Sequence, residues 1–205
     1  MARRTKEEAA ETRERILDAA LHVFSEKGYS QTTFVDIAKE IGLSKGAVYW
    51  HFKTKTDLLA AIIQHGKNMK CGRIKDAGPT TVAEVRELIV GTAQSIVDNE
   101  ELRKFEFFTG FQIEWSSELL SEVDSKLFAM QGDPMRDTCE VFSRLQELGE
   151  LNPDVDVNEL VTMIASFWMG ALHLMLSGKI EPTDFPPLLR KGYDRIVGIH
   201  ATSRT

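Results

Sequence analysis

The residues best suited to contact another large molecule lie in one short stretch, Lys45 to Phe52. If this stretch is helical, with about 100° between successive residues, then Lys45, Gly46, Tyr49 and Trp50 share one side. The opposite side is mostly small and apolar, which suits packing against other helices of the chain. A cation and two large aromatic rings on an outward face predict a contact. A DNA major groove fits this pattern, because it admits one helix and its phosphates attract cations.

Residues suited to phosphate binding flank this stretch. Thr32 and Thr33 precede a short helix whose free N–H groups favour anions, and Lys55 begins the next helix along the chain. A basic arm at residues 3–6 either follows a DNA backbone or is a solvated tail. The alternative for the two outward aromatic rings is packing beneath another helix. The predicted DNA contacts are Thr32, Thr33, Ser44, Lys45, Gly46, Tyr49, Trp50, His51 and Lys55.

Helical periodicity runs through the chain, and strand-like alternation is absent. Glycine at position 42 breaks the second helix, and Ser44 caps the third; three helices in about fifty residues with such a turn indicate a helix-turn-helix. The Gly132-Asp133-Pro134 segment should kink or split a long helix. We therefore predict an all-α fold with a DNA-binding domain at 1–53 and a helical ligand-binding and dimerisation domain at 54–205. The expected helices cover 8–26, 34–41, 45–52, 55 to about 75, 82–98, 101–114, 118–148, 157–176 and 184–199.

Charge and composition restrict the class of protein. Residues 1–75 carry a net charge of +5 and residues 76–205 a net charge of −11, which suggests nucleic-acid contact by one end, although ordinary fluctuation is the alternative. Cys71 and Cys139 are far apart, which fits a reducing cytoplasm and excludes a cysteine-built zinc site. No apolar run approaches the ~18 residues of a membrane span, Met163 to Leu176 being too short, and no secretory signal is present. We expect a cytoplasmic protein that does not enter a membrane.

Several segments resemble the TetR family of regulators. The resemblance lies in Thr12–Ala20, Phe24–Tyr29 and Ile37–Leu59 and covers about residues 8–65. The run Tyr-Trp-His-Phe-Lys at 49–53 and Ala-Arg-Arg-Thr-Lys at 2–6 resemble the AcrR-like branch of multidrug-efflux repressors. Residues 80–205 match only in helix count and size. The DNA contacts implied by position are Thr33, Lys45, Gly46, Tyr49, Trp50, His51 and Lys55.

The resemblance implies a homodimeric repressor that a small hydrophobic or cationic ligand releases from a near-palindromic operator in double-stranded DNA, in control of an efflux system. A ligand-responsive activator of the same fold is the main alternative. An enzyme is disfavoured because the histidines at 22, 51, 65, 173 and 200 lack metal-binding spacing, and no P-loop or His-Glu-x-x-His motif occurs. A module that does not bind DNA would leave Lys45, Tyr49 and Lys55 without a purpose. No cofactor and no metal are expected.

The C-terminal helices suggest a dimer and a ligand pocket. The helix 157–176 is apolar on two faces, which predicts a partner chain, with a central helix in a monomeric bundle as the alternative. The predicted dimer residues are Val161, Ala165, Met169, Leu172, Leu189, Tyr193 and Ile196. Aromatic residues concentrated after position 104 predict a pocket, with plain core packing as the alternative. The predicted pocket residues are Phe105, Phe108, Phe111, Gln112, Trp115, Met130, Phe142 and Trp168.

Overall fold

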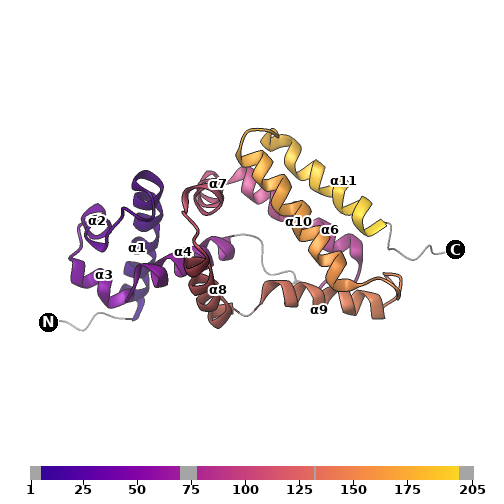
Figure 1. The fold of residues 1–205 in the computed structure, drawn as a ribbon, viewed down its shortest axis with the longest axis horizontal. Helices are drawn as coiled ribbons and strands as arrows, with labels where there is room; N and C mark the ends of the chain where they lie inside the picture. The colour runs from indigo at the N-terminus through magenta and orange to yellow at the C-terminus, as the bar shows by residue number, and fades with distance from the viewer. Residues whose placement is uncertain (1–5, 70–77, 132, 199–205) are drawn as a thin grey trace. The chain divides into compact units, whose positions relative to one another are not determined.

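The computed structural model describes residues 6–69, 78–131 and 133–198 (Figure 1). These residues form helices and connecting turns with no strand among them, which confirms the all-α class. The elements are α1 (Lys6–Lys27), α2 (Phe34–Glu40), α3 (Lys45–His51), α4 (Lys55–Met69), α6 (Val82–Asp98), α7 (Glu100–Phe107), η1 (Phe108–Gln112), α8 (Ser117–Gln131), α9 (Pro134–Glu147), α10 (Val157–Leu176), η2 (Pro182–Asp184) and α11 (Phe185–Gly198). Residues 3–5 of the predicted basic arm and Cys71 lie outside the described residues.

Capping residues set many of the helix boundaries. Thr33 and Thr81 each form a capping box, in which the threonine hydroxyl accepts from the third helical N–H. The expected long helix 118–148 splits into α8 and α9, as the Asp133-Pro134 pair predicts. Asp133 accepts from the Met135 N–H, and Pro134 occupies the first turn of α9, where its missing N–H removes no helical bond.

Several expected helix ends differ from the structure by one or a few residues, and two differences have a clear physical reason. The helix predicted over 101–114 is α7 followed by η1, a π-helical segment from Phe108 to Gln112, because apolar spacing alone does not separate the two kinds of turn. The last helix does not begin at Asp184. That residue ends the 3-10 turn η2, and α11 begins at Phe185 with two prolines in its first turn.

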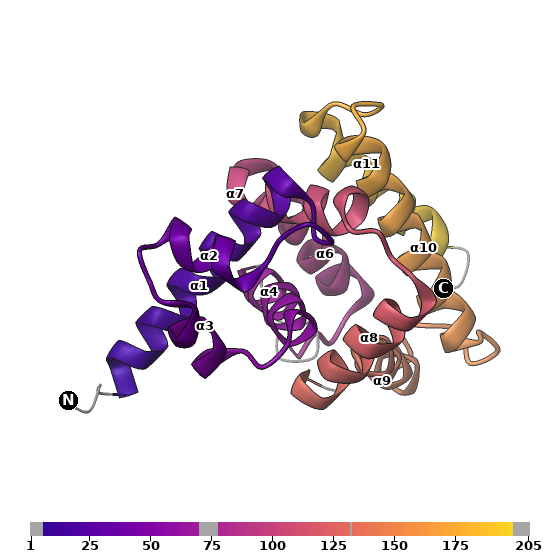
Figure 2. The same ribbon diagram turned by 60° about the vertical axis from the view of Figure 1, so that its left-hand side comes forward.

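The helices form two compact units. The first unit contains α1 to α4 and the chain from Lys104 through α8. Within it, α2 packs on α1 and on α3, while α4 packs on α1 and α8 (Figures 1 and 2). Fully buried residues from four helices form its core: Ile16, Phe24, Ile37, Val48 and Leu58. The predicted domain boundary at residue 53 stays a prediction; within this compact unit α4 packs on α1, which precedes that boundary.

The second unit contains α6, the chain to Arg103, and α9 to α11. In this unit α11 packs on α6 and α10, and α10 packs on α9 (Figure 1). Its core includes Val85, Phe142, Leu145 and Leu160. Among the described helices, α10 is long and apolar enough to cross a membrane by length and composition, with a mean hydropathy of 1.5. This corrects the expectation that no segment reaches that length, although core helices of other proteins pass the same test.

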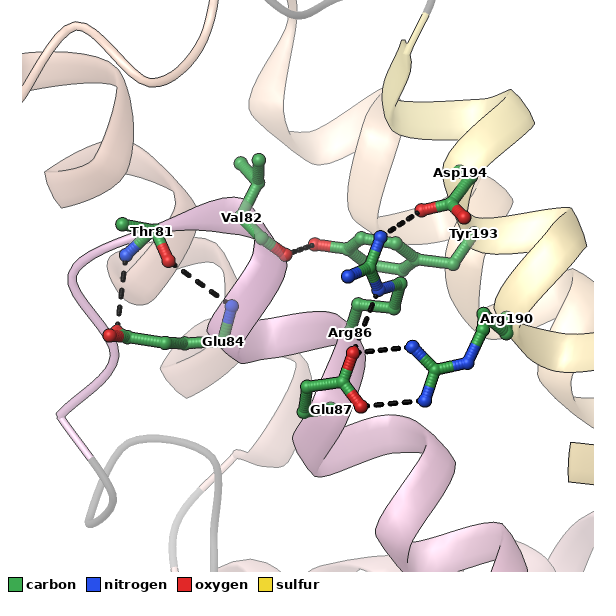
Figure 3. Close-up of polar contacts among 8 residues, drawn as sticks. All are labelled: Thr81, Val82, Glu84, Arg86, Glu87, Arg190, Tyr193 and Asp194. Carbon is green, nitrogen blue, oxygen red and sulfur yellow. Dashed lines mark hydrogen bonds and ion pairs between the residues drawn. The ribbon is translucent and has the colours of Figure 1, made fainter.

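Charged and polar side chains join α6 to α11 (Figure 3). Arg190 forms a two-pronged ion pair with Glu87, in which Nη2 lies 2.6 Å from Oε2. Arg86 donates to Glu87 (3.0 Å) and to Asp194 (2.8 Å), and so bridges the two carboxylates. The hydroxyl of Tyr193 donates to the Val82 carbonyl at 2.8 Å, and burial raises the pKa of this tyrosine. These contacts fix the register of α11 on α6.

We expect the Glu87 pairing to make stability depend on pH. The Arg190 and Arg86 guanidinium groups lower the pKa of Glu87 from 4.5 to about 2. Because the folded-state pKa is depressed, the stabilisation is complete above about pH 4.5 and declines as the pH falls towards 2. Glu87→Gln should lower the urea midpoint at about pH 7, and by less at about pH 3; the effect is small because the pair is exposed. Glu118→Gln on α8 is the control, and equal effects of Glu87→Gln at both pH values would contradict the prediction.

Candidate nucleic-acid interface

The turn between α2 and α3 places the third helix as the sequence predicts. Gly42 adopts a left-handed conformation with φ of 66°, and the N–H of Leu43 returns to the Ala38 carbonyl at 2.8 Å, which ends α2. Ser44 then caps α3 by accepting from the Ala47 N–H at 3.2 Å. Two short-range hydrogen bonds therefore fix the end of α2 and the start of α3.

The two predicted sides of α3 are confirmed. Val48 is fully buried, and the adjoining Phe52 is buried with it. On the other side, Lys45 and Gly46 are exposed, and the side chains of Tyr49 and Trp50 are 42% and 66% exposed. A tryptophan left two-thirds exposed does not contribute to the core, so among the described residues the alternative of packing beneath another helix does not hold.

Packing holds the exposed rings in fixed orientations. Tyr49 meets the Phe34 ring edge to face, with centroids 4.8 Å apart, and Lys45 Nζ lies 5.3 Å from the Tyr49 centroid. Trp50 stands perpendicular to the half-buried His51 ring at 4.5 Å. The exposed face of α3 is therefore partly rigid before any partner arrives, which lowers the entropic cost of binding.

Among residues 6–69, 78–131 and 133–198, no close contact accounts for the glycine at position 46. A Cβ atom built there would meet only the Ser44 Oγ, at 3.8 Å. The backbone is helical, a conformation in which glycine is about 1 kcal/mol worse than alanine. Glycine at this position lowers helix stability and leaves open space beside the backbone. That combination suits the close approach of a second molecule.

The flanking threonines differ in their availability. Thr33 is exposed and caps α2, where its N–H and hydroxyl both donate to Asp36. Lys27 lies 2.7 Å from the same carboxylate, and these hydrogen bonds lower the pKa of Asp36 well below its ordinary value. Thr32 is buried and donates to the Gly28 carbonyl at 2.9 Å, so its hydroxyl does not face solvent as the sequence suggested.

Lys55 is also turned inward. Its ammonium group donates to three main-chain carbonyls of the turn between α1 and α2, and burial lowers its pKa. Lys53 directly follows α3 and is exposed, yet it is absent from the predicted contacts. A basic residue two positions after the end of α3 is the sequence signal that would have made Lys53 a candidate phosphate contact.

The predicted pocket residues divide between the two units. In the first unit, Phe105 and Phe108 are buried, and Phe108 stacks on Phe24 with centroids 5.8 Å apart. Gln112 donates to the Ser25 carbonyl at 3.1 Å. The exposed members of the set are Phe111, Trp115 and Met130. In the second unit, Phe142 lies in the core and the half-buried Trp168 packs on Phe185. The pocket itself stays a prediction.

Two recesses lie on α6 in the second unit. One of about 110 Å³ is lined by residues that include Arg86, Tyr193 and Asp194, whose polar groups already bond to one another or to the main chain. The other is open and lined by Pro79, Ala83, Glu84, Glu87 and Leu88. Neither contains a predicted pocket residue. In the part of the chain that the structure describes, no group of three or more His, Cys, Asp or Glu side chains is arranged to hold a metal ion.

One side of α10 is exposed and mixes large apolar residues with small and polar ones. Met169 is 68% exposed, and Met163 and Leu174 are also exposed beside the small residues Ser166 and Gly170. The opposite side, which includes Val161, is buried in the second unit. Of the other predicted dimer residues, Leu189 and Tyr193 are buried, while Ala165, Leu172 and Ile196 are half-buried. The buried members pack within the second unit, and the dimer interface itself stays a prediction.

Comparison with known proteins agrees with this geometry. A family model described as bacterial regulatory proteins, tetR family, matches residues 16–62, which include α2 and α3. The HTH-type transcriptional regulator AcrR of Shigella flexneri is 40% identical over 110 residues, 50% of this chain and 50% of AcrR. The HTH-type transcriptional repressor BepR of Brucella suis biovar 1 (strain 1330) is 28% identical over 201 residues, 95% of this chain and 90% of BepR.

A solved structure extends the likeness along the chain. SmeT, the repressor of the Stenotrophomonas maltophilia multidrug efflux pump SmeDEF, superposes with a TM-score of 0.73 at 25% identity. The alignment covers 94% of this chain and 91% of SmeT. The match to AcrR, in contrast, spans about half of that regulator's length.

Proposed function

Because the chain belongs to the tetR family of bacterial regulatory proteins, we propose that it is a cytoplasmic transcriptional repressor that binds double-stranded operator DNA through α3. The observation that carries the proposal is the exposed face of Lys45, Gly46, Tyr49 and Trp50 on a helix whose other side is buried. A helix with such a face enters a major groove, where its side chains reach base edges and phosphates. The proposed contacts are Thr33, Ser44, Lys45, Gly46, Tyr49, Trp50 and His51.

The experiment that tests DNA binding is a fluorescence-anisotropy titration. Labelled DNA from the regions beside the protein's own gene is titrated with protein at several salt concentrations, with scrambled DNA of equal length as the control. We expect tighter binding to one region and a linear fall of log K with log salt, because phosphate contacts release counterions. A reporter gene placed behind that region separates repression from activation. Equal affinity for the scrambled DNA would contradict the proposal.

We further propose that a small hydrophobic or cationic ligand releases the repressor and that the regulated genes serve efflux. The support is the likeness to SmeT and AcrR, together with exposed aromatic side chains such as Phe111, which stacks on Phe107 at 5.1 Å. Release requires the ligand to prefer the state that does not bind DNA, typically by ~1–3 kcal/mol. Cationic dyes and antibiotics that raise the melting temperature should weaken operator binding. If none of the compounds that bind the protein weakens operator binding, the proposed release by ligand is wrong.

We also propose that the exposed side of α10 pairs with the same side of a second copy. Only 22% of the most apolar 18-residue window of α10 is buried among the described residues. A second copy related by a two-fold axis would cover the exposed side of this helix. Two paired copies can present two α3 helices about one DNA turn apart, on the order of 34–36 Å.

Met169→Asp should convert the dimer into a monomer. The change puts a charge at the most exposed apolar position of α10, where pairing would bury it without a partner. Light scattering after gel filtration should give twice the 23.1 kDa chain mass for the parent protein and the single mass for the variant. The matched control is Met135→Asp, at an exposed methionine on α9, which should stay dimeric. A monomeric parent protein would contradict the pairing.

A further inference from the structure

The ammonium group of Lys55, at the start of α4, is fully used inside the first unit. Nζ donates to the carbonyl oxygens of Tyr29 (2.8 Å), Ser30 (3.1 Å) and Thr32 (3.2 Å). A lysine ammonium carries three N–H donors, so this arrangement leaves none over. Nζ also lies 4.5 Å from the centroid of the Tyr29 ring, which adds a cation–π contact. A phosphate contact by Lys55 would require these bonds to break.

The three carbonyls belong to the turn that joins α1 to α2. Helix α1 ends at Lys27, and Gly28 follows in a left-handed conformation with φ of 82°. Main-chain carbonyls in such a turn have no place in a helical hydrogen-bond ladder and need other donors. A single cation placed among three of them satisfies the turn and fixes its course. Lys55 therefore stabilises the turn between α1 and α2.

This turn leads directly to the exposed face of α3. Thr32, whose carbonyl accepts from Lys55, is followed by Thr33, the cap of α2. The next residue, Phe34, supports the Tyr49 ring at a centroid distance of 4.8 Å. The chain of contacts therefore runs from Lys55 through the turn and the first residue of α2 to Tyr49. Because Lys55 also begins the helix after α3, it links the turn that precedes α2 to the segment that follows α3.

We propose that Lys55 is a positioning residue of the DNA-binding helices, which orients the α1–α2 turn and through it Tyr49, and that it is not a phosphate ligand. This inference rests on the proposed function, because its consequence for binding is measured on operator DNA. It differs from the role that the position of Lys55 in the sequence suggests, in which a basic residue beside α3 contacts the DNA backbone.

The salt dependence of binding separates the two roles. Each phosphate contact contributes about −0.9 to the slope of log K against log salt. We expect Lys55→Met to weaken operator binding roughly tenfold while the slope stays within about 0.3 of the parent value. Lys55→Arg should weaken operator binding to a similar degree, because a planar guanidinium does not direct three donors at three converging carbonyls. The matched control is Lys53→Met, at an exposed lysine, and it should not disturb the turn.

Hydrogen exchange of the free protein tests the internal role without DNA. In Lys55→Met and Lys55→Arg, amides of residues 30–34 should exchange faster, while the buried α10 amides and the melting temperature of the second unit stay unchanged. A uniform rise in exchange, or no rise at residues 30–34, would overturn the proposal. A slope that falls in magnitude by about 0.9 in Lys55→Met, with parent-like binding by Lys55→Arg, would also overturn it. Absence of operator binding by the parent protein would instead refute the proposed function and leave the exchange test valid.

Discussion

Gly46→Leu is expected to stabilise the folded protein and to weaken operator binding at the same time. The position lies within α3, and an added Cβ meets only Ser44 Oγ at 3.8 Å. Leucine is a better helix former than glycine by roughly 0.5–1 kcal/mol, so the melting temperature should rise by a few degrees. The same side chain would fill the space that α3 needs to approach base edges. We expect operator affinity to fall by about 1–3 kcal/mol or more, the range that one lost base contact costs.

The opposite signs make this a sharp test of the α3 face. Gly46→Ala should be intermediate, with nearly the same gain in stability and a smaller loss of affinity. Gly91→Ala on α6 is the control, because a Cβ there meets nothing within 4 Å and α6 is not proposed to touch DNA. Thermal melts at fixed protein concentration and anisotropy titrations at fixed salt measure the two effects. Parent-like affinity in Gly46→Leu would mean that this face does not enter the groove.

The α3 face was predictable from sequence because every determinant is local. A fixed rotation per residue separates Val48 from Trp50, and Gly42 and Ser44 set the ends of the flanking helices within a few residues. The prediction needed only one assumption about packing, namely that the apolar side of the helix is buried. No knowledge of distant segments was needed to choose the outward side.

Lys55 and Thr32 show where that reasoning stops. Both are polar residues at the start of helices that flank α3, Thr32 just before α2 and Lys55 at the start of α4, and residue type alone favours phosphate binding. The carbonyl that accepts from the Thr32 hydroxyl is four residues earlier in the same turn, and the carbonyls that accept from Lys55 are 23 to 26 positions away in sequence. The spacing of Tyr29 and Thr32 in the sequence does not predict that their carbonyls converge on one ammonium group.

The α10 helix presents a different limit. Val161 and Met169 are both predicted dimer residues, yet Val161 is buried in the second unit and Met169 is 68% exposed. Periodicity identifies an apolar side by contrast with a polar side. On a helix with two apolar faces that contrast does not single out one side, so the sequence indicates burial on several sides without saying which side a partner covers.

Gly66→Ala is the second change with a large expected effect, and here the sign is destabilising. The sequence offered no reason for this glycine, which lies within α4. In the structure, a Cβ at this position would lie closer than 3.0 Å to three ring atoms of Phe105, from the end of α7. The ring is buried, so it has little room to move aside. Overpacking of this kind costs about 1–3 kcal/mol, and each kcal/mol lowers the melting temperature by about 2–4 °C in a protein of this size.

A double-mutant cycle isolates the cause. Phe105→Leu removes the ring that the new Cβ meets, so Gly66→Ala should cost much less in that background than alone. Gly91→Ala again serves as the control, since alanine at an open helical glycine should stabilise by about 0.5–1 kcal/mol. The comparison with Gly192→Ala is informative, because its Cβ would also meet a ring, that of the half-buried Phe167. A half-buried ring can shift, so Gly192→Ala should cost less than Gly66→Ala. Additive losses in the Gly66–Phe105 cycle would mean that the close packing of α7 on α4 does not explain this glycine.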